Sequence, residues 1–332
     1  MSAPPAARVT PPRSEEDSPR GWRFWWDMLT GRVARIVFLL ATVGLGGYAV
    51  AREWPDVRSA LADLGPLPVI GGLVAALLAM IAAMMVWRVL LAALGSPLPP
   101  RVAAGIVFVG QLGKYLPGSI WPVVAQMELA SAHQVPRRRS ATASVLTLLV
   151  SLLAGLLTAL VTLPFVAGIS GPYRWALLAV PALLVFLHPR VLNPVLGRLL
   201  RLARRPALEH PLTGRAIATA LGWAFASWLL YGAQVWLLAI PLGGLDFRGA
   251  LLAVGGFAFA WSVGFLVIPA PAGAGVREIV LIAVLSTTLS VGDATAIALV
   301  SRALLTIGDL LTASVAAWSS RRAARATRTT SA

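Results

Sequence analysis

The sequence predicts an all-helical membrane protein that crosses the bilayer about eight times. Of its 332 residues, 58% are hydrophobic and only 12% carry a charge, whereas soluble domains contain about 25% charged residues. A spanning helix needs about 20 mostly apolar residues, and the apolar runs of this chain supply about eight such lengths. The runs of Leu, Ala and Val are long and unbroken, which favours helices over the alternating strands of a membrane barrel.

The apolar runs also fix where the helices are expected. The expected spans are 33–51, 67–94, 141–168, 174–188, 216–240, 249–268, 276–290 and 294–318. Two regions interrupt the pattern, a broken segment at 102–126 and a Pro/Gly break at 269–275. Three parts follow from this: a disordered and interfacial cytoplasmic N-terminus at 1–32, a transmembrane domain at 33–318 and a basic cytoplasmic tail at 319–332.

The arginines predict the topology. With the N-terminus inside, the cytoplasmic segments hold 21 arginines, and the outer segments hold only Arg52, Arg58, Arg174 and Arg248. This asymmetry is typical of short cytoplasmic loops. It requires 102–126 to enter and leave on the same side, as a re-entrant hairpin does; a segment lying on the surface fits the count equally well. We expect both termini to be cytoplasmic, and we interpret the net charge of +15 as topological signals and lipid contacts rather than nucleic-acid binding.

Several kinds of chemistry are excluded or unsupported. The chain has no cysteine, which excludes disulfides, Cys-ligated metals, Fe–S clusters and thiol catalysis. No Ser/His/Asp, paired-carboxylate or P-loop arrangement stands out either. We therefore expect no enzymatic activity, no cofactor and no metal.

The first break contains Lys114, the only lysine of the chain. It is followed by Tyr115 and by Pro117 and Gly118, which end a short helix. Ionisable groups at membrane depth are costly and tend to line cavities or pair with one another. We expect Lys114 and Tyr115 to face an inside cavity; the alternative is a snorkelling lysine and a tyrosine of the aromatic belt.

The second break has the composition of an anion site. Pro269 and Pro271 stop the preceding helix, and Gly273 and Gly275 allow backbone conformations that other residues resist. The helix that starts at about Val276 offers free N–H groups to an anion. Arg277 in its first turn adds a planar fork suited to phosphate. Glu278 can pair with Arg277 or Lys114, and the alternative is a cytoplasmic loop with a helix cap and a snorkelling arginine.

Further polar residues occur at membrane depth. Arg302 and Asp309 are seven residues apart, so they share a helix face but are too far apart to pair along it. Each is expected to find a partner on another helix, such as Glu278 for Arg302, either as a structural ion pair or as part of transport. The remaining candidates are Gln111, Gln126, Glu128 and Gln234. Two broken segments in corresponding places of the two halves are typical of transporters with discontinuous helices.

At these breaks the chain resembles the transmembrane flippase part of the lysylphosphatidylglycerol synthases and its stand-alone relatives. The first family pattern, a lysine followed by Leu-Pro-Gly, is matched by Lys114, Leu116, Pro117 and Gly118. The second is matched by Pro269, Pro271, Gly273, Gly275, Arg277 and Glu278, with Ala272 where glycine is usual. A late Arg-to-Asp pattern is similar to Arg302 and Asp309. The resemblance covers about residues 33–318, and it departs from the family where Trp121, Pro122, Gln126 and Glu128 replace further glycines and an arginine.

The resemblance implies lipid transport in a bacterial cytoplasmic membrane. The expected substrate is an anionic or aminoacylated phospholipid, or a polyprenyl-phosphate-linked lipid, whose phosphate is held by Lys114, Tyr115, Gly118, Gly273, Gly275 and Arg277. Charge balance or proton coupling is expected from Glu278, Arg302, Asp309 and Glu128. The sequence lacks the aminoacyl-transfer domain of the synthases, so lysyl transfer is not expected. The alternative function is a non-transporting partner or regulator of a lipid-modifying enzyme or glycosyltransferase; homo-oligomers are also possible partners.

Overall fold

The computed structural model describes residues 54–115, 120–167, 212–244, 246–266 and 275–329, and a few helical positions between 185 and 198. All regular structure in these residues is helical. The helices are α3 (Trp54–Asp63), α4 (Pro66–Ala93), α5 (Pro100–Gln111), α6 (Trp121–Ser131), α7 (Arg137–Ala167), α11 (Gly214–Ala239), α12 (Phe247–Leu266), α13 (Val276–Leu285) and α14 (Val291–Thr329), with the 3₁₀ turns η1 (Leu112–Tyr115) and η2 (Ile240–Leu242).

Five of these helices are long and apolar enough to cross a membrane: α4, α7, α11, α12 and α14. They agree with the spans expected at 67–94, 141–168, 216–240, 249–268 and 294–318, which confirms the all-helical membrane fold. The spans expected at 33–51 and 174–188 lie outside the described residues. The helix expected at 276–290 is shorter, because α13 has ten residues and is therefore about 15 Å long, half of the hydrocarbon core.

Local sequence explains where the helices begin. Pro66 and Pro100 occupy the first turns of α4 and α5, where a missing N–H costs nothing. Thr213 caps α11, because its hydroxyl accepts the Ala216 N–H at 3.2 Å. Asp246 caps α12 in the same way by accepting the Gly249 N–H at 2.7 Å.

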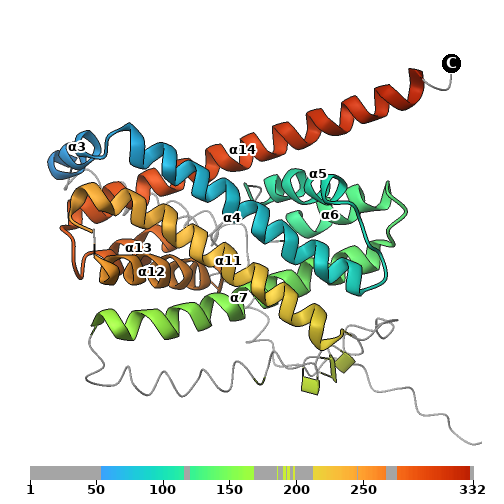
Figure 1. Cartoon of the computed structure of the whole chain (residues 1–332), viewed down its shortest axis with the longest axis horizontal. Coiled ribbons are helices and arrows are strands. Elements are labelled where there is room, and N and C mark those ends of the chain that lie inside the picture. The colour runs from blue at the N-terminus through green and yellow to red at the C-terminus, as the bar shows by residue number, and fades with distance from the viewer. Residues whose placement is uncertain are drawn as a thin grey trace, which may run out of the picture.

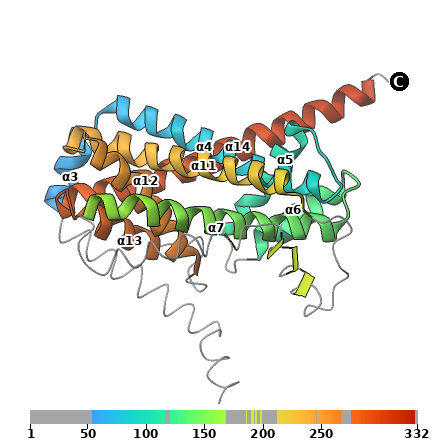
Figure 2. The same cartoon turned by 60° about the horizontal axis from the view of Figure 1, so that its bottom comes forward.

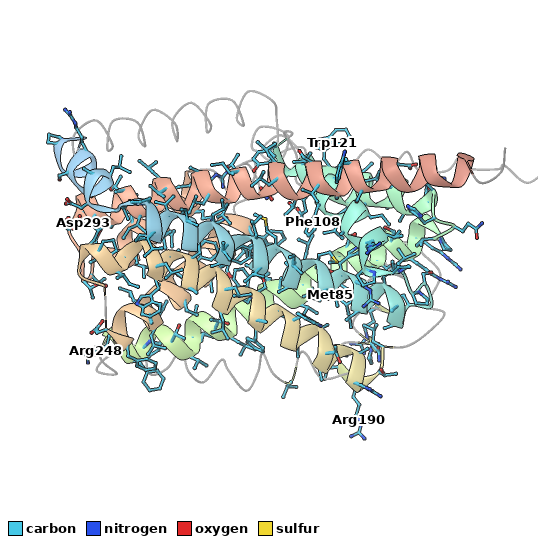
Figure 3. The ribbon with its side chains drawn as sticks, turned by 45° about the horizontal axis from the view of Figure 1, so that its top comes forward. Met85, Phe108, Trp121, Arg190, Arg248 and Asp293 are labelled. Atoms are coloured by element: carbon cyan, nitrogen blue, oxygen red, sulfur yellow. The ribbon has the colours of Figure 1, made fainter. Side chains whose placement is uncertain are left out.

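The bundle is built around long helices, with one helix pair toward each end. α4, α7, α11 and α14 run along its length, α5 and α6 lie side by side at one end, and α12 and α13 lie toward the other (Figures 1 and 2). Figure 3 shows Arg190 at the α5–α6 end and Arg248 and Asp293 at the opposite end. The bundle therefore has two polar ends, as a membrane protein requires.

Small residues let the helices approach one another closely. A Cβ at Gly232 of α11 would overlap Val254 of α12, and a Cβ at Gly255 of α12 would overlap Thr162 of α7. Close backbone approach is how membrane helices gain packing energy, because lipid tails are as apolar as their side chains. The core that results includes the fully buried Trp87.

The segment expected at 102–126 is a helical hairpin. α5 has 12 residues and α6 has 11, so neither reaches the length of about 20 that a full crossing needs. The two helices pack against each other, and a Cβ at Gly113 would lie 2.8 Å from the Trp121 carbonyl carbon. The broken segment is thus a hairpin of two short helices, and η1 is the described part of its tip.

Candidate functional site: a cationic cavity between the two broken segments

A cavity of about 270 Å³ lies where the tip of the α5–α6 hairpin meets the start of α13. Its walls come from α4, α5, η1, α6, α7, α11, α12, α13 and α14. The ionisable residues that line it are Lys114, Tyr115, Tyr231, Arg277, Arg302 and Asp309. Lys114 of the first broken segment and Arg277, two residues after the second break, therefore line one shared cavity.

Lys114 is paired with Asp309 across the cavity. The Lys114 Nζ lies 2.5 Å from the Asp309 Oδ2, and the Tyr115 hydroxyl donates to the same oxygen at 2.6 Å. The side chain of Asp309 is 7% exposed, and that of Lys114 is 31% exposed. Two neighbouring side chains thus fasten the hairpin tip to α14, and Asp309 has its expected partner on another element.

Glu278 holds the start of α13 in two ways. One carboxylate oxygen accepts the Gly275 N–H at 2.6 Å, at a position where Gly275 has a φ of 83° that favours glycine. The other oxygen lies 3.5 Å from the Arg302 guanidinium. The pairing expected between Glu278 and Arg302 is confirmed. Because Glu278 takes the Gly275 N–H, this amide is not free for an anion.

Arg277 differs from the other two cations of the cavity. Its guanidinium lies 4.3 Å from the centroid of the Phe257 ring, and Tyr231 stacks on Phe257 at 5.1 Å. Gly264 makes room for it, because a Cβ there would lie 3.2 Å from the Arg277 Cβ. Among the described residues, Arg277 has no ion pair or hydrogen bond.

Among the residues that the structure describes, the charges around the cavity do not cancel. Lys114, Arg277 and Arg302 carry three positive charges, whereas Asp309 and Glu278 carry two negative ones. A surplus positive charge in a partly buried site favours an anionic ligand. The arrangement can bind and orient an anion, and the described residues contain no cluster of acidic or imidazole groups that could hold a metal ion.

Other residues singled out in the sequence lie in different places. Gln111 and Gln126 line the cavity. Glu128 does not; it forms an exposed ion pair at 2.8 Å with Arg137, the first residue of the next helix. Gln234 is buried in the core, where it accepts the Ser301 hydroxyl at 3.1 Å. Gly118 and Gly273 lie outside the described residues.

The cavity also has walls that the sequence reasoning missed. One wall is aromatic and consists of Trp228, Tyr231, Phe257 and Trp261. Another carries hydroxyls: Ser144, Thr147 and Ser151 of α7 and Ser227 of α11. The spacing of Ser144, Thr147 and Ser151, at i, i+3 and i+7 of one apolar span, places them on one helix face and was a detectable signal.

Comparison with known proteins places the chain in a family. No curated protein gives a significant match. The family model described as the lysylphosphatidylglycerol synthase TM region matches residues 32–313, which include the whole cavity and both breaks. The chain is thus an integral membrane protein that belongs to the lysylphosphatidylglycerol synthase transmembrane-region family.

Proposed function

We propose that this protein moves a lipid with a phosphate-bearing headgroup between the leaflets of the membrane. The observation that carries the proposal is the surplus positive charge of the cavity, with Arg277 left without an ion-pair partner among the described residues. Family membership supports a lipid-related function in the membrane. Guanidinium binds phosphate bidentately, so Arg277 is the first contact that we assign to the headgroup.

The depth of the cavity suits a transporter. Arg277 lies eight residues before the end of α13, and Arg302 lies eleven residues after the start of α14. These spacings correspond to about 12 and 16 Å along the helices, in a hydrocarbon core about 30 Å thick. With the ends of both helices at one interface, the two arginines lie close to the bilayer midplane.

The two broken segments supply the elements that alternating access requires. The α5–α6 hairpin enters from one end of the bundle, and α12 and α13 approach from the other (Figure 1). In transporters with discontinuous helices, substrate sites lie between such elements near the midplane. In our proposal the phosphate sits between them while the acyl tails stay in the bilayer.

Lys114 is held differently from Arg277, and this gives it a different role. Its charge is balanced by Asp309 at 2.5 Å. We assign to Lys114 a second contact with the phosphate, which forms only when Asp309 is displaced. The arriving phosphate competes with Asp309 for the ammonium group and so loosens the hairpin tip from α14. In this proposal, binding of the headgroup releases the hairpin, and the movement of the hairpin opens the cavity.

The proposal includes orientation. The α5–α6 end carries Arg137, Arg138 and Arg139 at the start of α7, and Arg190 (Figure 3), so we place it in the cytoplasm of a bacterial cell, in the inner membrane, with both termini on that side. We also propose a transporter rather than an enzyme, because the cavity groups bind and balance charge without an assignable nucleophile or base.

The test is headgroup translocation by the purified protein in liposomes. Fluorescent phosphatidylglycerol is incorporated, and the inward-facing fraction is followed by dithionite quenching. The Arg277→Ala variant should lower the transport rate by about tenfold or more, because a charge-assisted hydrogen bond is lost. Arg277→Lys keeps the charge but not the fork, so its rate should lie between the two.

The matched control is Arg248→Ala, which removes an exposed arginine at the far end of the bundle (Figure 3). It should transport at the parent rate. Equal rates for the parent and Arg277→Ala would disprove the assigned contact. Absence of transport by the folded parent protein with any anionic lipid would instead favour a role as a membrane partner of a lipid-modifying enzyme.

A further inference from the structure

Both carboxylates near the cavity already have cations. Asp309 is paired with Lys114 and also accepts the Tyr115 hydroxyl. Glu278 is divided between Arg302 and the Gly275 N–H. A headgroup that carried its own ammonium would therefore meet a surplus of positive charge and no uncompensated carboxylate among the described residues, and like charges in a partly buried site repel strongly.

In contrast to the two carboxylates, several neutral polar groups of the cavity have no hydrogen-bond partner among the described residues. Gln126 and Ser227 are each 5% exposed, and both line the cavity. Among the described residues, neither the Gln126 side-chain amide nitrogen nor the Ser227 hydroxyl has a hydrogen-bond partner. The side chains of Gln111 and Ser151, which also line the cavity, have none either. These atoms are not among the fully buried polar atoms of the described residues that lack a partner, so they are accessible from the cavity, where a ligand can supply the hydrogen bonds that polar groups favour.

Gln126 is held in place by a buried hydrogen-bond chain. The Ser144 hydroxyl lies 2.5 Å from the Gln126 Oε1, and it accepts the Trp87 indole N–H at 3.1 Å. The Ser140 hydroxyl donates to the Gln126 backbone carbonyl at 3.2 Å. With its oxygen occupied as an acceptor, Gln126 presents the two N–H donors of its amide to the cavity.

The hydroxyl-bearing wall follows one face of α7. Ser144 and Ser151 are seven residues apart on one face of α7, a distance of about 10 Å along the helix. A ligand that contacts both the cationic residues and this wall has a phosphate for the cations and a neutral group with several hydroxyls for the wall. The hydroxyls would serve as acceptors for Gln126 and as donors or acceptors for Ser227 and Ser151.

Because the cavity offers cations for a phosphate and neutral polar side chains for hydroxyls, but no free carboxylate among the described residues, we infer the class of the substrate. It is an anionic lipid whose phosphate carries a neutral, hydroxyl-bearing group such as a polyol or sugar, rather than a cationic aminoacyl group. This inference rests on the proposed transport function and specifies its substrate class. Gln126 and Ser227 are the residues that we assign to recognition of the neutral group.

The experiment compares three fluorescent lipids in the same liposomes. Phosphatidylglycerol carries a phosphate and a glycerol, phosphatidic acid carries the phosphate alone, and lysyl-phosphatidylglycerol adds a cationic aminoacyl group. We expect phosphatidylglycerol to move about tenfold faster than each of the other two, the factor that one or two hydrogen bonds provide. This result requires only the parent protein.

Two variants then locate the selectivity. Gln126→Met keeps the length of the side chain without its amide, and Ser227→Ala removes one hydroxyl. Each should lower the phosphatidylglycerol rate toward that of phosphatidic acid and leave the phosphatidic acid rate unchanged. Ser319→Ala, which removes an exposed hydroxyl of α14, is the matched control and should change neither rate.

The outcomes separate the inference from the proposed function. If lysyl-phosphatidylglycerol moves as fast as phosphatidylglycerol, the inference is wrong and lipid transport stands. If phosphatidic acid equals phosphatidylglycerol, the neutral wall does not recognise the headgroup, which also overturns the inference. If the folded protein moves none of the three lipids, the proposed function itself fails.

Discussion

The two broken segments of this protein use their cations in opposite ways. At the α5–α6 hairpin, Lys114 is fastened to Asp309 and the helices are pressed together at Gly113. At the start of α13, Arg277 rests on the Phe257 ring, and its neighbour Glu278 binds Arg302 instead. The comparison teaches that a cation in the cavity is not by itself a free ligand site: Lys114 is held by a carboxylate that an anion must displace, whereas Arg277 has no such partner among the described residues and is directly available.

The largest effect should come from removing the partner of Lys114. Asp309→Asn leaves the ammonium without its carboxylate. Removing one member of a buried ion pair costs about 3–5 kcal/mol, and because the Lys114 side chain is 31% exposed we expect a loss near the lower end of that range. The measurement is the free energy of unfolding in detergent with increasing denaturant. The double variant Lys114→Met/Asp309→Asn removes both charges and should recover much of the loss; an Asp309→Asn protein as stable as the parent would contradict the structural role of the pair.

The next effect concerns the packing of the hairpin. A Cβ at Gly113 would meet the Trp121 backbone at 2.8 Å, and backbone cannot move aside as a flexible side chain can. Gly113→Ala should therefore destabilise the protein by about 1–3 kcal/mol. A Cβ at Gly222 of α11 would meet no neighbouring atom within 4 Å, so Gly222→Ala should instead stabilise by about 0.5–1 kcal/mol. A thermal unfolding series of both variants shows whether the signs differ.

A smaller effect tests the support of Arg277. Phe257→Leu removes the ring beneath the guanidinium, a contact worth about 0.5–2 kcal/mol. The rate of phosphatidylglycerol transport should fall severalfold, less than for Arg277→Ala. In the Arg277→Ala background the same substitution should have no further effect, since the guanidinium that the ring supports is absent. An equal effect in both backgrounds would show that Phe257 acts independently of Arg277.

The smallest effect belongs to the second ion pair of the hairpin. Arg137 lowers the pKa of Glu128 below its ordinary value through a hydrogen bond, so the pair stabilises the protein at neutral pH and is lost in acid as Glu128 becomes protonated. The pair is fully exposed, however, and such pairs contribute little. Glu128→Gln should leave the midpoint of thermal unfolding unchanged at pH 7 and at pH 4. A loss of stability as large as that of Asp309→Asn would show that the exposed pair stabilises the protein as much as the Lys114–Asp309 pair does.

Composition and hydropathy were sufficient to predict the long helices. The spans that became α4, α7, α11, α12 and α14 were set by apolar runs that have no other stable form in lipid. The pairing of Arg302 with Glu278 could also be predicted, because each charge needed a partner outside its own helix. α13 was expected to be longer, but it ends at Leu285, where Ser286, Thr287 and Thr288 begin a turn.

The rest of the site depends on contacts that no local pattern encodes. Lys114 and Asp309 are 195 positions apart, and only the docking of the hairpin on α14 brings them together. The aromatic residues Trp228 and Trp261 lie inside apolar runs, where a cavity wall and a core position have the same sequence signature. Glu128 shows the converse, since a polar residue close to the break in sequence points to the exterior of the bundle.

The length of α14 has a mechanical consequence. This helix has 39 residues and is continuous from Asp309 at the cavity to Thr329, about 30 Å farther on. It continues past residue 318, where the apolar run ends, and extends beyond the rest of the bundle (Figure 1). A rigid rod of this kind acts as a lever: a tilt of about 10° around Asp309 displaces its far end by about 5 Å. A spectroscopic probe at Thr329 would thus report the state of the cavity from outside the membrane.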